Sequence, residues 1–110
     1  MKVILVGAGA FGVKHLEALA KIDGVEVVSL VSRDPASTAA VATKWKVPHC
    51  TTDLGEALAQ PGVEAALLCS PTQLHAQQAL QCLAAGKHVM IEMSGEARKS
   101  WHYTVFGDAE

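Results

Sequence analysis

The sequence predicts an α/β fold in which a single domain is built on a doubly wound parallel sheet. Short apolar segments alternate with stretches of helical pattern along most of the 110 residues, and the connections between them are short. This alternation is typical of a parallel sheet that is covered by helices on both faces. The length fits one domain of common size and leaves no room for a second.

The predicted strands are apolar, as expected for parallel strands that are buried on both faces. Five segments have this pattern, of which the third is short: residues 3–6, 25–31, 47–51, 65–69 and 88–91. Helices are predicted between them, over residues 10–22, from residue 35 onward, and over 53–58 and 73–85.

Caps and apolar spacing mark the helices. Asp34 is the expected N-cap of the second helix, and Pro35 occupies its first position. Asp53-x-x-Glu56 is a variant of the capping box and predicts the start of the third helix. In the fourth helix, one apolar stripe predicts the buried face, and it consists of Ala76, Ala79, Leu80 and Leu83.

Composition and charge limit the partners that we expect. Half of the residues are hydrophobic and 18% are charged, which indicates a folded chain. The net charge of -2 provides no basic surface, so neither nucleic acid nor a membrane is expected as a partner. Cys50, Cys69 and Cys82 lie far apart and predict buried free thiols rather than a disulfide or a metal site. Free thiols suit a reducing compartment, and we expect a cytoplasmic protein.

The first predicted strand runs directly into three glycines, spaced as Gly7-x-Gly9-x-x-Gly12. Gly7 permits the tight turn, Gly9 lets the backbone approach a pyrophosphate, and Gly12 allows close packing of helix on strand. The N–H groups of the first helical turn point at the bound anion, and this turn includes Ala10 and Phe11. A strand before the glycines and a helix after them are the context that a dinucleotide site requires. The sequence therefore predicts a Rossmann fold that binds a nicotinamide dinucleotide.

The end of the second strand indicates which dinucleotide is bound. About 20 residues after Gly12, where an NAD site usually has an acidic residue, the chain reads Ser32-Arg33-Asp34. Ser32 can donate to a 2′-phosphate, and Arg33 can pair with the phosphate and stack on adenine. An inward-facing Asp34 would favour NAD(H), whereas Asp34 as a helix cap leaves the site to NADP(H). We predict NADP as the cofactor, with NAD as the alternative.

Two later segments resemble a known family. Ser70-Pro71-Thr72-x-x-His75 and the run from Ala85 to Glu92, taken with the glycine motif, are similar to the N-terminal domain of the Gfo/Idh/MocA oxidoreductases. The resemblance covers about residues 1–92. It implies a Rossmann domain joined to a larger α+β domain that binds the substrate. It also implies that Ser70, Pro71 and His75 line the nicotinamide side of the cofactor, with Glu92 near the nicotinamide ribose; a solvated or capping histidine is the alternative for His75.

The chain departs from the family after Glu92. The family usually has lysine and proline next, and that lysine positions the substrate and the nicotinamide. Met93 and Ser94 stand there instead, and a thioether neither carries positive charge nor donates a proton. We therefore predict no catalytic residue in this chain.

Residues 95–110 do not resemble the family, so we divide the chain into a dinucleotide-binding domain, 1–94, and a divergent tail, 95–110. The tail holds three of the five aromatic residues, and it is expected to form an extra strand, a covering helix or a segment docked on a partner. We expect the cofactor domain of an oxidoreductase for a sugar, a polyol or a similar carbonyl or hydroxyl substrate, inactive alone. It is either a natural short protein or a fragment. The alternative is a nucleotide-sensing or assembly module that forms a homodimer through the tail.

Overall fold

Strands and helices alternate along the chain in the computed structural model, which describes residues 1–7, 10–70, 72–92 and 103–106. The strands are β1 (Lys2–Val6), β2 (Glu26–Val31), β3 (His49–Thr51), β4 (Val63–Leu68), β5 (His88–Glu92) and β6 (Tyr103–Phe106). The helices are α1 (Ala10–Leu19), α2 (Pro35–Lys44), α3 (Leu54–Leu58) and α4 (Thr72–Ala84).

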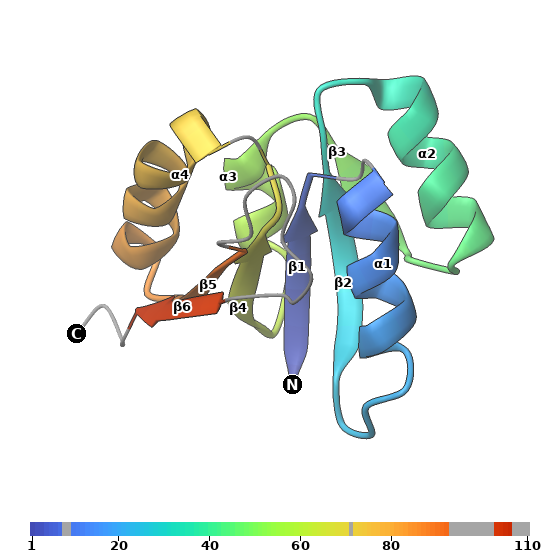
Figure 1. Cartoon of the computed structure of the whole chain (residues 1–110), viewed down its shortest axis with the longest axis horizontal. Helices are drawn as coiled ribbons and strands as arrows, with labels where there is room; N and C mark the ends of the chain where they lie inside the picture. Colours follow the sequence, from blue (N-terminus) through green and yellow to red (C-terminus); the bar gives the residue numbers. More distant parts are fainter. Residues whose placement is uncertain (8–9, 71, 93–102, 107–110) are drawn as a thin grey trace.

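All the strands join one sheet, in the order β3-β2-β1-β4-β5-β6 (Figure 1). The first five run parallel, and β6 pairs antiparallel with β5. From β1 the chain builds the sheet outward to β3 on one side, then returns to place β4 on the other side of β1. This reversal between β1 and β4 is the point at which open α/β sheets bind ligands, outside the carboxyl ends of the strands.

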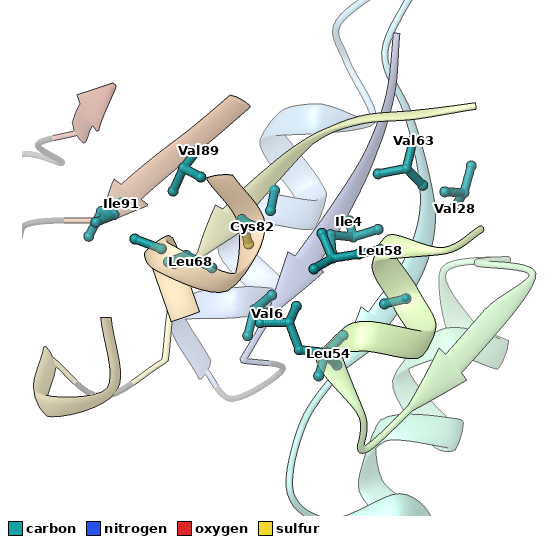
Figure 2. Close-up of a cluster of buried hydrophobic side chains, with 14 residues drawn as sticks. Ile4, Val6, Val28, Leu54, Leu58, Val63, Leu68, Cys82, Val89 and Ile91 are labelled. Carbon is teal, nitrogen blue, oxygen red and sulfur yellow. The ribbon is translucent and has the colours of Figure 1, made fainter. Parts of the chain in front are cut away.

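Helices cover both faces of the sheet, so each strand needs apolar residues on both sides. On one face α3 and α4 pack over Ile4 and Val6 of β1, and Ile4 lies beside Leu58 of α3 in Figure 2. On the other face α1 and α2 pack over Leu5, which lies between Ile4 and Val6 in β1. Because successive strand residues point to opposite faces, a continuous apolar run supplies both cores. The predicted doubly wound parallel sheet is confirmed.

Two helices differ from the sequence prediction at their ends. The first ends at Leu19 instead of residue 22, because Lys21 N and Ile22 N donate to carbonyls only three residues back and the chain turns at Gly24. At the start of α3, Asp53 accepts from Gly55 N at 2.9 Å as a cap. The capping box is not completed, since the N–H of Asp53 donates to Thr51 Oγ1 instead.

The buried face of α4 is rotated from the predicted stripe. Leu80 is 69% exposed and Ala76 is also exposed, whereas Ala79 and Cys82 are buried in the core. His75, one turn before Ala79, is buried on the same side. The prediction took every apolar residue at helical spacing as core and could not anticipate a buried histidine.

The tail contributes one strand to the described structure. Tyr103–Phe106 forms β6, in agreement with the extra strand considered for it. The remaining residues of 95–110 lie outside the described part, so the domain boundary at 94 and the role of the tail in assembly stay predictions. None of the helices in the described ranges has the length and hydropathy needed to cross a membrane.

The cysteines are free thiols, but only Cys82 is fully buried. Burial raises the pKa of its thiol from the ordinary 9.0 to about 11. In the unfolded chain the thiol ionises with its ordinary pKa of 9.0. The contribution of Cys82 to the free energy of unfolding is therefore complete below pH 9 and is lost as the pH rises toward 11.

We therefore expect the free energy of unfolding to fall by about 1 kcal/mol between neutral pH and pH 10 through Cys82 alone. Urea unfolding at a series of pH values measures this slope. Cys82→Ala removes it, although the variant starts from lower stability because of the cavity. Cys50→Ala keeps Cys82 and should keep the slope; loss of the slope there would contradict the assignment.

Candidate nucleotide-binding site

The turn after β1 brings two strand ends into direct contact. Gly7 has a φ of +98° and its N–H donates to Val31 O of β2 at 2.6 Å. A Cβ at this position would lie 2.8 Å from Ser70 N and 2.9 Å from the carbonyl carbon of Cys69. Only glycine fits this contact, and the backbone leaving β1 therefore passes directly against the segment that leaves β4.

Beyond this contact, the first turn of α1 begins at Ala10 and continues through Phe11 and Gly12. Gly9 and the side chains of this turn lie outside the described part of the chain, so their predicted contacts with a pyrophosphate stay predictions. The N–H groups of a first helical turn have no partners within the helix, and they face the carboxyl edge of the sheet from which α1 begins.

A pocket of about 300 Å³ opens at this edge. Its walls come from the segments that follow β1, β2 and β4, together with the starts of α3 and α4, including Leu54 and Leu74. Such a volume is at the lower end of the range for small-molecule sites, roughly 300–1,000 Å³. The pocket therefore lies at the predicted position and suits about half of a dinucleotide.

Ser32 and Arg33 line the pocket after β2, whereas Asp34 does not. The carboxylate of Asp34 accepts from Ala36 N at 3.1 Å, which makes it the N-cap of α2, as predicted. Arg33 is exposed, and its guanidinium forms no ion pair with any other described residue. The pocket thus has an uncompensated cation at one wall, where an anionic ligand would be favoured.

Ser70 lines the opposite wall, and two residues of α4 hold it in place. The ring of His75, 7% exposed, lies with Nε2 2.6 Å from Ser70 O and donates to it, because a carbonyl oxygen only accepts. The hydroxyl of Ser70 donates to Gln78 Oε1. His75 does not line the pocket itself, so the role that the resemblance implies for it stays a prediction.

The roles predicted for two further site residues stay predictions. Pro71 lies outside the described residues, and Glu92 ends β5, with a side chain about which the structure gives nothing. Gln78 was missed by the sequence analysis although it lines the pocket. The sequence offered no signal for it, because Leu74, which lies four residues earlier on the same face of α4, was not a predicted site residue either.

The family is shown by comparison with known proteins. The family described as "Oxidoreductase family, NAD-binding Rossmann fold" matches residues 1–93. This chain belongs to the Gfo/Idh/MocA family. It carries the family's NAD-binding Rossmann domain, and the geometry of the glycine turn and the pocket at the sheet's reversal fits the cofactor.

The relatives are longer proteins. The chain is 55% identical over 93 residues to 4-carboxy-2-hydroxymuconate-6-semialdehyde dehydrogenase from Sphingobium, covering 84% of this chain and 30% of the relative. It is 37% identical to inositol 2-dehydrogenase from Mycolicibacterium smegmatis, covering 84% of this chain and 27% of the relative. The chain therefore spans about 30% of the length of the curated relatives it matches.

Solved structures agree with this assignment. The chain resembles GenD2 from gentamicin A biosynthesis, in complex with NAD, with a TM-score of 0.80 and 34% identity, covering 84% of this chain and 26% of that one. It also resembles scyllo-inositol dehydrogenase from Lactobacillus casei with bound NAD(H) and scyllo-inositol, with a TM-score of 0.78 and 29% identity, covering 84% and 28%.

The contact at Gly7 is directly testable with a matched pair of variants. Gly7→Ala adds a clash with the backbone of Ser70 to the strain of a positive φ, and we expect a loss of about 2–5 kcal/mol of stability. Gly24→Ala, at a φ of +85° with no atom within 4 Å of the added carbon, has the strain alone and should lose about 1–2 kcal/mol. Urea unfolding measures the free energy of unfolding of both variants. Equal losses would show that the close approach of Gly7 to Ser70 does not add to the cost of the substitution.

Proposed function

We propose that this chain binds NADP(H) in preference to NAD(H) and supplies the cofactor-binding part of a hydride-transferring oxidoreductase. The observation that carries the proposal is the arrangement after β2. Arg33 lines the pocket without an ion-pair partner among the described residues, while the neighbouring carboxylate of Asp34 is held by the N-terminus of α2.

The preference has a simple electrostatic reason. A 2′-phosphate near Arg33 and the hydroxyl of Ser32 gains charge-assisted hydrogen bonds, each about 1.5–3 kcal/mol. A dinucleotide without this phosphate gains none of them. An acidic residue that accepts from the ribose 2′-hydroxyl would reverse the preference, but the carboxylate of Asp34 accepts from Ala36 N instead.

When bound, the nicotinamide supplies the hydride donor or acceptor. The residues of this chain bind and orient the cofactor from the carboxyl edge of the sheet. Hydride transfer also needs an oriented substrate and a proton donor or acceptor within reach. Met93, where the family usually has lysine, provides no such group.

The identity to a semialdehyde dehydrogenase and to inositol dehydrogenases supports a small carbonyl or hydroxyl compound as the substrate of the whole enzyme. The family model that matches residues 1–93 describes an NAD-binding Rossmann fold, and we infer that another part of the enzyme binds this substrate.

Fluorescence titration of the chain with NADPH and NADH tests the cofactor preference. We expect NADPH to bind between tenfold and a hundredfold more tightly, which corresponds to one charge-assisted hydrogen bond. Arg33→Gln should remove most of this difference by weakening NADPH binding. Lys21→Gln, which removes an exposed cation in the connection between α1 and β2, is the matched control and should leave both affinities unchanged. Tighter binding of NADH than of NADPH would overturn the preference.

The isolated chain should also be unable to turn over a substrate. With NADPH and a small aldehyde or polyol-derived ketone, we expect the absorbance of the reduced nicotinamide to decline no faster than without protein. The matched positive control is any active dehydrogenase under the same conditions. Consumption of NADPH in proportion to the concentration of this chain would disprove the inactivity.

A further inference from the structure

The outer face of α4 carries a large apolar residue that the fold leaves uncovered. Leu80 is 69% exposed, although its place in the apolar stripe predicted a buried side chain. The helix packs on β4, β5 and α3 through its opposite face, where Ala79 and Cys82 are buried. In Figure 1, α4 forms one edge of the molecule, and no other described helix or strand lies beyond it. Leu80 is therefore directed away from the core that its own helix helps to build.

The same face of α4 has no charged residue. The 13 residues of the helix include no aspartate, glutamate, lysine or arginine, whereas each of the other described helices has at least one of them. The outer side of a surface helix usually carries charged and polar residues. Depletion of charge is typical of the centre of a protein–protein interface. The outer face of α4 thus has the composition of an interface rather than that of a solvated surface.

The residues on either side of Leu80 are arranged symmetrically along the helix. Ala76 lies one turn before it and Ala84 one turn after it, and both are exposed. Residues four apart lie on one face of a helix, so the large side chain has a small one on each side. In an antiparallel pair of such helices, a two-fold axis at Leu80 places this residue against its own copy and each Ala76 opposite an Ala84. The face is therefore complementary to itself, as a two-fold contact requires.

The polar residues beside this stripe also suit a second copy of the chain. Gln73 and Gln77 are exposed on the same side of α4. A glutamine amide both donates and accepts, so it can pair with the same residue of another copy. A face without charge causes no repulsion between two like copies and offers no attraction to a charged partner.

The length of α4 determines how strong such a contact can be. A helix of 13 residues is about 20 Å long. One helix pair of this length buries less than the roughly 800 Å² per partner of a standard interface. The expected dimer is therefore weak and depends on protein concentration.

We propose that the outer face of α4, centred on Leu80, joins two copies of this chain in an antiparallel contact with two-fold symmetry. Leu80, Ala76 and Ala84 do not line the nucleotide pocket. The contact therefore goes beyond the proposed function, and either can fail without the other.

Sedimentation equilibrium at increasing protein concentration tests the contact. We expect a reversible equilibrium between monomer and dimer in the unaltered chain. Leu80→Gln should raise the Kd of the dimer about tenfold or more, because each dimer loses two buried leucines at its centre. Ile22→Gln is the matched control, since Ile22 is the other large aliphatic residue exposed within the described chain, at 50%, and lies between α1 and β2. This variant should dimerise like the unaltered chain.

Three outcomes of this experiment would overturn the proposal. The unaltered chain could stay monomeric at every concentration, or Leu80→Gln could dimerise as well as the unaltered chain, which would place the contact elsewhere. Ile22→Gln could also weaken the dimer as much as Leu80→Gln does, which would indicate unspecific association of apolar residues. Circular dichroism spectra of both variants check that the fold is kept.

Cysteine cross-linking tests the geometry of the contact. In the antiparallel arrangement Leu80→Cys brings two thiols together at the axis, and mild oxidation should join the copies by a disulfide. Ala76→Cys places its two thiols about 12 Å apart along the helices, beyond the Cα separation of about 7 Å that a disulfide tolerates. The unaltered chain, with its three native cysteines, provides the background. Equal cross-linking of Leu80→Cys and Ala76→Cys, or none above background for Leu80→Cys, would show that the helices do not pair about Leu80.

Discussion

The structure depends on the close approach of two chain segments at the point where the strand order reverses. Gly7 N donates to Val31 O at 2.6 Å, and Cys69 N donates to Val6 O at 2.7 Å, so the ends of β2, β1 and β4 are joined in sequence. A side chain at Gly7 would separate β1 from the segment after β4. The absence of one side chain therefore determines the distance between the two walls of the pocket.

Helix α4 connects this contact to the core. Ala79 and Cys82 pack on the sheet, while Leu74 and Gln78 face the pocket and His75 holds the carbonyl of Ser70. A ligand that binds between these walls, and only to the folded chain, stabilises the native state by an amount that grows with the logarithm of its concentration divided by its Kd. Packing of α4 and binding of the cofactor are thus coupled through one helix.

The sequence was sufficient for features set by local chemistry or by a repeating environment. Strands buried on both faces need continuous apolar runs, so all five parallel strands could be predicted. The cap at Asp34 follows from its own side chain and from Pro35. Features decided by which of several competing groups a residue pairs with were not predictable. At the start of α3, Asp53 N donates to Thr51 Oγ1. The carboxylate of Glu56 is turned to His49 of β3, with Oε2 3.2 Å from His49 Nε2.

The same distinction applies to the site. Gly7, Ser32, Arg33 and Ser70 follow strand ends, and every parallel strand brings its end to the same edge, so their place in the pocket could be inferred. Gln78 could not, because a polar residue on a helix is compatible with solvent as well as with a pocket. The hydrogen bond from Ser70 and its place in the wall of the pocket distinguish it from the exposed Gln77 beside it.

The opposite charges of Arg33 and Asp34 are kept from pairing by the way in which α2 begins. Asp34 has extended backbone angles, with φ of −101° and ψ of 107°, and its carboxylate accepts from Ala36 N in the first turn of α2. This cap contributes about 1 kcal/mol to stability. Because the carboxylate is held there, it forms no ion pair with Arg33 in the described part of the chain, and the guanidinium at the pocket is left to pair with an anion. An interaction that begins a helix thereby determines the electrostatics of the neighbouring site.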